Sequence, residues 1–538
     1  MRRWLSALIL FGLVAGEAGA AKPMRILTRI GPWPILSKPI FYDGRLWAVN
    51  SVLGRNHNSA DIYSVDLMSG RPRYERHLIS QDAGDPVIAD GLLYWPYEDP
   101  RTSVGWGLIA VTDGRDWRRL LIPTARIFHI HAMAAANGRL IAATSAWRAG
   151  VAVSDDSGRT WRTLYDHPTP ARQVSRIVSL VAVGDRAYGE IKAPDGRRLL
   201  MIDGTDVGPA PGWPTGQPTL AMVAFAGRLL GLVREDGGVA VWATDGVGST
   251  RLAAPVHERN LFALATDGAA LWAVGGGDGN WRLWRSSDGR AWSSTHDLAG
   301  GTPYAIAVGD GHLLVTGAGD DGKGIVWHAA IARSHATPRK PRGRLPLHRR
   351  GDTAAVDWTN AAKDLRKALA DPATYQEHGR GLRDRIQALV SQTPPTAFFS
   401  DLLHAPMPQS ELSLIGGNVV VPAQTLGRWL LLWGMRQSGQ GRVPVTWLQA
   451  PWTAPANSSE KYFDTAMAAI WTVAAVAEDD SATIDALINR LGRAGDPDWL
   501  TGDIVGALSQ LTGQRFAYDI AEWQAWWRRA EMTWRGKP

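Results

Sequence analysis

The sequence predicts a seven-bladed β-propeller followed by an all-helical domain. Two short phrases recur with a shared period over about residues 24–332, and the apolar pattern changes to helical spacing after residue 351. Each repeat holds four short alternating runs, which is the size of one propeller blade. The chain has 538 residues, of which 45% are hydrophobic and 20% charged, so it is long enough for several domains and is not a disordered chain.

The first phrase is a glycine-containing turn followed by alternating apolar residues. Its seven copies begin at Asp43, Asp90, Asn137, Gly184, Ala226, Asp267 and Asp310. Successive copies lie 47, 47, 47, 42, 41 and 43 residues apart. Such a turn between two alternating runs is typical of a β-hairpin, so the seven copies predict seven blades.

The seventh repeat is one strand short. It ends at the run 325–331, and the apolar segment 24–30 precedes the first blade without belonging to a repeat of its own. Pairing these two segments would complete the last blade, close the ring and cover both strand edges.

The second phrase contains an Asp and ends in Trp. The fullest copy, 154–161, carries Ser154, Asp156, Gly158 and Trp161, and shorter copies carry Asp113 with Trp117 and Asp288 with Trp292. Degenerate copies centre on Asp66, Asp203 and Asp245. Ser and Asp side chains accept hydrogen bonds from the backbone N–H groups of a turn, glycine adopts positive φ, and Trp covers the neighbouring sheet.

This phrase resembles the Asp box, Ser-x-Asp-x-Gly-x-x-Trp, of sialidases, sortilin-type ectodomains and related propellers. The resemblance implies a structural role for these residues, on the face opposite the functional one. Asp156 and Asp288 are therefore not expected to be catalytic.

Helical spacing after residue 351 predicts helices over 354–370, 377–391, 460–478, 481–493, 498–512 and 520–532, with loops near 437–457. The segment 511–519 and the Trp residues after it resemble the end of bacterial HEAT-like helical repeats. That resemblance implies that Gly513 ends one helix and Asp519 caps the next. It also implies that Trp523 and Trp527 face inward as a packing cap.

The first twenty residues resemble a secretory signal. Arg2 and Arg3 precede an apolar run, and Ala18-Gly19-Ala20 fits a cleavage site. An N-terminal membrane anchor is the alternative, although the run is short for a bilayer span. We expect four regions: a signal peptide (1–20), the propeller (21–332), a basic Pro-rich linker (333–350) and a HEAT-like helical domain (351–538). The implied location is periplasmic or extracellular in a bacterium.

Charge and cysteine content narrow the partners further. The net charge of +7 resides in the linker, which carries seven basic residues and no acid. The linker is either a solvated hinge or a contact for an anionic surface. Because the rest of the chain is neutral, a nucleic-acid partner is disfavoured. No segment after the N-terminal run reaches 18 apolar residues without a charge, so no further membrane span is predicted. The absence of Cys excludes disulfides and thiolate metal sites.

The propeller mouth is the candidate site, because the loops at one face of the ring converge there. Polar residues precede the predicted inner strands at Lys38, Asp82, Asp85, His129, His131, Arg176, Glu258, Arg259 and Tyr304, and Glu98 lies in a loop between second and third strands. These residues either bind a polar ligand or form an ordinary solvated rim. His129 and His131 alternate on one strand, but no third ligand is evident, so neither a metal nor a cofactor is expected.

No catalytic residue can be assigned from the sequence. A sialidase-like motif, Arg29-Ile30-Gly31-Pro32, is interrupted by Gly31, and no arginine triad accompanies a Tyr–Glu pair. Esterase, Walker A, metalloprotease and EF-hand motifs are lacking from the sequence. The sequence favours a non-catalytic binding or scaffold protein whose mouth takes a protein, peptide or glycan. The alternatives are a carbohydrate-active enzyme that uses carboxylates at the mouth, and a scaffold whose helical domain binds the partner.

Overall fold

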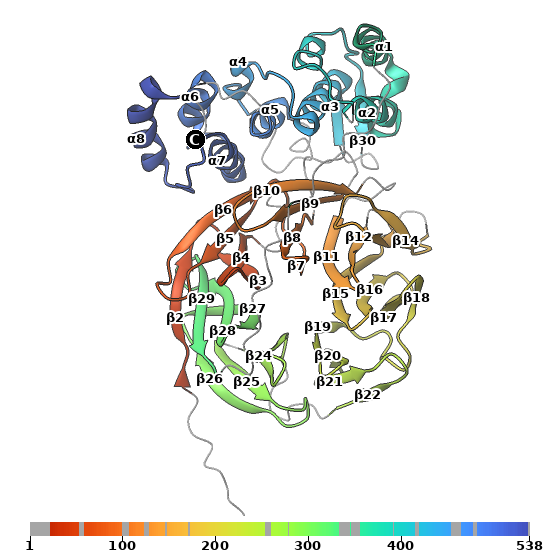
Figure 1. Ribbon diagram of the computed structural model, residues 1–538, viewed down its shortest axis with the longest axis vertical. Coiled ribbons are helices and arrows are strands. Elements are labelled where there is room, and N and C mark those ends of the chain that lie inside the picture. Colours follow the sequence, from red (N-terminus) through yellow and green to blue (C-terminus); the bar gives the residue numbers. More distant parts are fainter. Residues whose placement is uncertain are drawn as a thin grey trace, which may run out of the picture.

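The structure is a computed structural model of the chain (Figure 1). It describes residues 22–52, 59–98, 107–122, 129–145, 148–170, 173–252, 260–277, 279–332, 345, 356–390, 392–414, 419–452, 464–476 and 481–535. The expected signal peptide lies outside the described residues, and only Leu345 of the expected linker lies within them.

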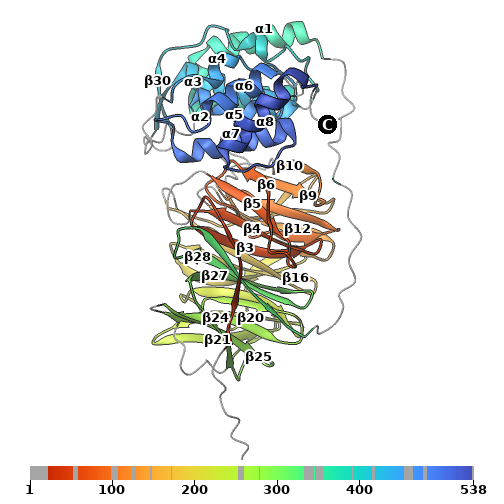
Figure 2. The same cartoon turned by 90° about the vertical axis from the view of Figure 1, so that its left-hand side faces the viewer.

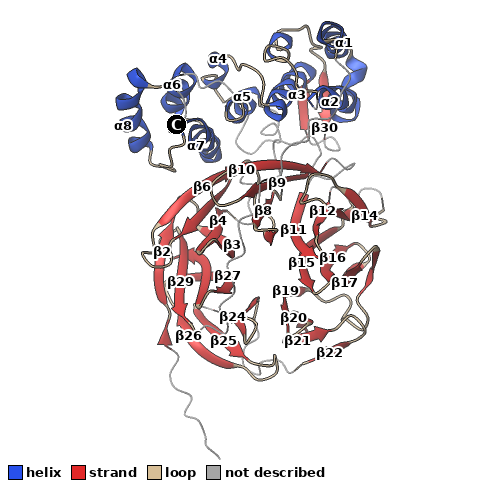
Figure 3. Ribbon diagram, in the orientation of Figure 1, coloured by secondary structure: helices blue, strands red, loops and turns tan. Residues whose placement is uncertain are grey.

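The described strands between Lys22 and Ala330 form a seven-bladed propeller, as predicted (Figure 3). Blade one contains β3 (Ile35–Tyr42), β4 (Arg45–Ser51), β5 (Ala60–Val65) and β6 (Pro72–Leu78); blade two contains β7 (Val87–Ala89), β8 (Leu92–Pro96), β9 (Gly107–Thr112) and β10 (Trp117–Ile122). Blade three contains β11 (His129–Ala136), β12 (Arg139–Ser145), β13 (Ala149–Ser154) and β14 (Arg162–Asp166); blade four contains β15 (Arg176–Val183), β16 (Arg186–Ala193), β17 (Gly196–Asp203) and β18 (Asp206–Pro209). Blade five contains β19 (Thr219–Phe225), β20 (Arg228–Glu235), β21 (Gly238–Thr244) and β22 (Ser249–Arg251); blade six contains β23 (Ala263–Thr266), β24 (Leu271–Gly277), β25 (Asn280–Ser286) and β26 (Ser293–Leu298).

Blade seven closes the ring in the predicted way. It contains β27 (Gly301–Gly309), β28 (His312–Gly319) and β29 (Gly324–Ala330), and its outer strand is β2 (Arg25–Ile30) from the other end of the domain. β2 runs antiparallel to β29, with Arg25 opposite His328 and Ile30 opposite Gly324. β1 (Lys22–Pro23), which was not predicted, adds a fifth, parallel strand to blade six.

The recurring turn phrase forms the tight hairpin between the two inner strands. In blade one Asp43 has φ 50° and Gly44 has φ 74°, and in blade three Asn137 has φ 50° and Gly138 has φ 71°. Positive φ at both central residues is the type I′ arrangement, whose twist matches that of the flanking strands. This requirement explains why Asp or Asn followed by Gly recurs at these positions.

The C-terminal region is helical, with one small hairpin. It contains α1 (Trp358–Ala370), η1 (Pro372–Tyr375), α2 (Gln376–Val390), η2 (Ser400–Leu402), β30 (Glu411–Leu414), β31 (Val419–Pro422), α3 (Ala423–Ser438), α4 (Val445–Leu448), α5 (Thr465–Val473), α6 (Ser481–Arg490), α7 (Asp498–Thr512), α8 (Ile520–Ala530) and η5 (Glu531–Thr533). Each predicted helix overlaps an observed one. The hairpin and α3 were not predicted, and α4 lies within a predicted loop.

The end of the helical region has the expected caps. Gly513 ends α7 with φ 75°, and the Asp519 carboxylate accepts the Glu522 amide hydrogen at the start of α8, at 2.9 Å. Trp523 and Trp527 are buried on the inner side of α8. None of the described helices combines the length and apolar character that a membrane span requires.

The helical region lies against the rim of the ring, beside the outer strands of blades one and two, and not over the opening (Figures 1 and 2). One apolar cluster runs across the boundary, from Tyr63 and Tyr74 of the propeller to Leu500 and Ile504 of α7. The two modules therefore share a core, and the central opening of the ring stays clear of the helices.

Candidate functional site

Polar residues from the starts of the first four inner strands gather at the mouth. Five of the eight ligand-binding residues predicted from the sequence belong to this group, and Lys38 and Glu98 join them. We call the following residues the mouth cluster: Lys38, Asp82, Asp85, Glu98, His129, His131 and Arg176. Glu258 and Arg259 lie outside the described residues, and Tyr304 is an exposed residue of β27 on blade seven.

An ion pair connects blade one to blade two. Lys38 interrupts the register of β3, with φ 54°, and its Nζ donates to Asp85 Oδ1 at 2.6 Å. The Asp85 backbone is in turn bonded to β11, because its N–H donates to His131 O at 2.8 Å and its carbonyl accepts from Met133 N at 3.1 Å. Burial opposes the charge on Lys38, but Asp85, Asp82 and Glu98 outweigh it and raise the Lys38 pKa. Asp85 is thus fixed between three blades.

Asp82 is the most enclosed acid of the cluster. It is 8% exposed, and its Oδ1 accepts the Ala83 amide hydrogen at 2.8 Å. Burial raises the Asp82 pKa, while Lys38 and the hydrogen bonds to its carboxylate act in the opposite direction. A buried acid with a raised pKa is also a feature of general acids, so Asp82 is the residue to examine for catalysis.

The two histidines lie together, as their alternation predicted. Their rings stack with centroids 5.4 Å apart and an interplanar angle of 14°. His129 Nδ1 is 2.5 Å from the Glu98 carbonyl oxygen, so Nδ1 carries the proton that it donates. Burial, together with electrostatic interactions with His129, Arg176 and Lys38, lowers the pKa of His131 to about 3. His131 is therefore neutral at physiological pH.

One series of contacts in this cluster has the residue types of a catalytic triad, Ser–His–Glu. His131 Nε2 lies 3.2 Å from Ser145 Oγ, and His131 Nδ1 lies 3.8 Å from Glu98 Oε1. A nucleophile must reach its substrate, but Ser145 is 1% exposed, and 3.8 Å is beyond hydrogen-bond distance. The arrangement supports a polar network that holds the imidazole, and it does not support acyl transfer.

Arg176 contributes a cation with an unused donor. Its Nε is buried and has no hydrogen-bond partner among the described residues. The cluster therefore combines a buried, unpartnered guanidinium nitrogen with a neutral imidazole and the ion-paired carboxylate of Asp85. The described residues include no group of three or more His, Asp or Glu placed to hold a metal ion.

The Asp-containing turns lie at the other end of the strands. Ser154 Oγ donates to Asp156 Oδ1 at 2.8 Å and accepts the Gly158 amide hydrogen at 2.8 Å, and Trp161 Nε1 donates to Gly158 O at 3.0 Å. The same contacts recur among Ser286, Asp288, Gly289 and Trp292. The Asp113 carboxylate accepts the amide hydrogens of Arg115 and Asp116. Trp117 packs on Trp47, with centroids 6.1 Å apart. These contacts support the structural role proposed for the turns.

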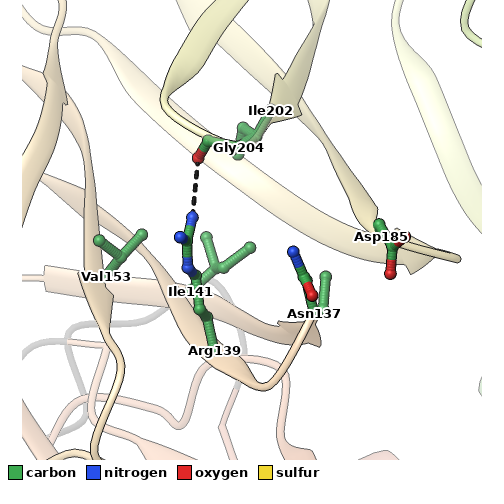
Figure 4. Close-up of a pocket in the computed structure, with 8 residues that line it drawn as sticks. Asn137, Arg139, Ile141, Val153, Asp185, Ile202 and Gly204 are labelled. Atoms are coloured by element: carbon green, nitrogen blue, oxygen red, sulfur yellow. Dashed lines mark hydrogen bonds between the residues drawn. The ribbon is translucent and has the colours of Figure 1, made fainter.

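A narrow crevice on this side lies between blades three and four (Figure 4). Ile141, Val153 and Ile202 form part of its wall, and Arg139 Nη1 crosses it to donate to Gly204 O at 3.1 Å. Because the arginine already bridges the two blades, the crevice is a packed seam between them. No sequence motif predicted this crevice.

Comparison with known proteins adds the following. No family model matches the chain, and no curated protein matches it. Similar solved structures include YCF48 from Cyanidioschyzon merolae, with 14% identity and a TM-score of 0.41 over 56% of this chain and 98% of that one. The propeller domain of the Trilobed protease from Pyrococcus furiosus has 10% identity and a TM-score of 0.40 over 56% of this chain and 96% of that one. A chain of the Mitotic Checkpoint Complex has 11% identity and a TM-score of 0.40 over 60% of this chain and 100% of that one.

Proposed function

We propose that this protein is an exported, non-catalytic binding or scaffold protein whose mouth cluster binds a polar group of a protein, peptide or glycan. The observation that carries the proposal is the fixed set of donors and acceptors at the mouth. The Lys38–Asp85 pair, the stacked histidines and the unpartnered Arg176 Nε come from separate blades of the closed ring. A preorganised site loses little conformational entropy on binding.

The partners of the two mouth carboxylates favour ligand binding over hydrolysis. Asp85 is occupied by Lys38, and Asp82 is enclosed and hydrogen-bonded to its own turn. A glycoside hydrolase generally uses two carboxyl groups that face the same bond. Because Asp85 is ion-paired with Lys38, it is not available as one of two such carboxyl groups.

The binding proposal is tested with peptide and glycan arrays, followed by titration of the best ligand. We expect Arg176→Gln and His129→Ala each to weaken binding about tenfold, because each removes a hydrogen-bonding group from the site. Arg290→Gln, on the exposed turn at the other end of blade six, is the matched control and should leave affinity unchanged. Binding that survives both mouth substitutions would instead assign partner recognition to the helical region.

The enzyme alternative rests on Asp82, since burial raises its pKa as it does in general acids. A panel of glycan substrates tests it with wild type, Asp82→Asn and Glu98→Gln. We expect no turnover. Hydrolysis that is lost on either substitution would replace the binding proposal with a carbohydrate-active enzyme.

Export and the domain division are part of the proposal. They rest on the signal-like first twenty residues and on the basic linker 333–350, which is proposed as a hinge or a contact for an anionic surface. Mass spectrometry of the mature protein from a periplasmic fraction should find an N-terminus after Ala20. An intact Met1 in a membrane fraction would favour the anchor alternative.

A further inference from the structure

Three arginines meet where the propeller contacts the helical region. Arg76 lies on β6, Arg119 on β10 and Arg436 in the last turn of α3, and we call them the arginine cluster. Arg119 Nη2 donates to the backbone oxygen of Arg436 at 3.3 Å. The Arg76 guanidinium lies 5.4 Å from the ring centre of Trp117, which is on the same side of β10 as Arg119. The three side chains thus converge from two blades and one helix.

The cluster has buried donors without acceptors. Arg76 Nε, Arg119 Nη1, and Nε and Nη1 of Arg436 are all inaccessible to solvent and have no hydrogen-bond partner among the described residues. Arg436 as a whole is 4% exposed. Buried guanidinium groups are ordinarily paired, because an unpaired buried charge is strongly destabilising.

The acid that acts on the arginine cluster already has a hydrogen-bond partner. Asp503 is the acid that acts on Arg436 among the described residues, and its Oδ1 is bonded to His77 Nε2 at 2.9 Å. Burial, together with the like charges of Arg119 and Arg76, lowers the pKa of Arg436 well below its usual value. Burial and Arg76 likewise lower the pKa of Arg119 to about 10, although Tyr97 acts in the opposite direction. The region therefore carries an excess of positive charge.

Aromatic rings compensate for part of this charge. The Arg436 guanidinium lies 4.9 Å from the ring centre of Trp471, at a distance that allows a cation–π interaction. A ring face attracts the cation but accepts none of the in-plane N–H groups. An oxyanion supplies both the negative charge and the acceptors, because its oxygens match the planar fork of a guanidinium.

We propose that the arginine cluster binds a small oxyanion, such as phosphate, between blades one and two and α3. The anion accepts hydrogen bonds from the four unpartnered nitrogens and neutralises the excess charge. It also ties the helical region to the rim, because its ligands come from both modules. This site is separate from the mouth cluster and does not depend on the function proposed for it.

Thermal unfolding of the full chain in phosphate-free buffer tests the proposal. We expect about 5 mM inorganic phosphate to raise the Tm by about 3 °C or more, since a ligand that binds only the folded state stabilises it. Sodium chloride at matched ionic strength should raise the Tm far less, because screening alone does not fill the donors. The same measurement is made with glycerol phosphate. A Tm increase equal to that with phosphate indicates that the natural ligand is a phosphate group on a larger molecule. A smaller increase indicates that it is the free anion.

Two substitutions and a control separate binding from general salt effects. Arg436→Met should abolish the phosphate response, and Arg119→Lys should weaken it because an ammonium lacks the fork. Arg529→Met, on the exposed side of α8, should keep the full response. If Arg436→Met does not fold, the phosphate response of Arg119→Lys and phosphorus NMR of phosphate added to wild type still test whether phosphate binds the cluster. Equal responses to phosphate and chloride, or a response kept in both cluster variants, would overturn the proposal.

Discussion

At the scale of single residues, the boundary between the modules depends on one buried imidazole. His77 Nδ1 lies 2.8 Å from Asp61 Oδ1 and His77 Nε2 lies 2.9 Å from Asp503 Oδ1, so the ring connects β6 with α7. Asp61 also accepts from Trp33 Nε1 at 2.7 Å and from Tyr518 Oη at 2.5 Å. Three donors from different parts of the chain thus converge on the Asp61 carboxylate.

This contact predicts a pH-dependent stability. Burial disfavours charged His77, but Asp61 and Asp503 outweigh it and raise the His77 pKa. Because the folded value exceeds the unfolded one, the stabilisation is complete below pH of about 6.5 and declines as the pH rises through the raised pKa. Chemical unfolding of wild type between pH 6 and 9 should show this decline as about one proton released. His77→Gln should be less stable and lack that component; an identical pH profile in the variant would contradict the assignment.

Asp61 gives a second prediction at this scale. Asp61→Ala leaves the buried donors of Trp33, His77 and Tyr518 without their acceptor, and we expect a loss of about 3 kcal/mol in the free energy of unfolding. Asp66→Ala is a matched control, because the partners of its exposed carboxylate among the described residues are its own turn and Arg45. Equal losses for the two substitutions would show that Asp61 has no special role.

At the scale of elements, α7 can approach the propeller because glycines face β6. A Cβ at position 506 would lie 2.7 Å from His77 Cβ, and one at 502 would lie 2.5 Å from Ser59 Oγ. Because α7 lies so close to β6, the Asp503 carboxylate reaches the His77 imidazole. Asp503 lies between the two glycines in the helix. The glycines thus place the buried ion pair as well as the helix.

Alanine substitution should therefore act oppositely at two helical glycines. Gly506→Ala should destabilise the protein by about 1–3 kcal/mol through overpacking against His77. Gly381→Ala in α2 should stabilise it by about 0.5–1 kcal/mol, because the nearest atom to the new Cβ is 3.6 Å away and alanine favours helix. Equilibrium unfolding in denaturant measures both; a stabilising Gly506→Ala would exclude the close contact.

The elements that the sequence revealed are those with local signals. The Asp-Gly and Asn-Gly turns located the hairpins, and aligning on them placed Lys38, Asp82 and His131 at the mouth. By contrast, α3 carries the run Leu430–Trp433, which is buried on every side and shows no helical periodicity. Contacts between modules had no local signal either, since His77 and Asp503 are 426 residues apart.

At the scale of the whole molecule, a ring without disulfides is closed by one strand from the other end of the domain. β2 completes blade seven, and Ile30 at its end is 2% exposed within the core cluster. Ile26 of the same strand is 40% exposed. Arg29 of β2 also pairs with Asp321 at 2.8 Å. The closure therefore combines strand pairing and apolar packing with a polar contact at the surface.

Substitutions along β2 test this closure. Ile30→Asp should destabilise the protein by more than about 3 kcal/mol and promote aggregation, because it buries a charge and frees the edge of β29. Ile26→Asp should change stability by no more than about 0.5 kcal/mol, as expected of a surface position. Thermal unfolding with light scattering distinguishes the two, and equal behaviour would mean that β2 does not hold the ring closed.

The proposal that the mouth cluster is a non-catalytic binding site is tested most directly by calorimetric titration of the ligand selected on the arrays. The wild type should bind it with unchanged ligand recovered afterwards, and Arg176→Gln should bind it about tenfold more weakly. Undiminished affinity in Arg176→Gln, or recovery of a cleaved ligand, would contradict the proposal.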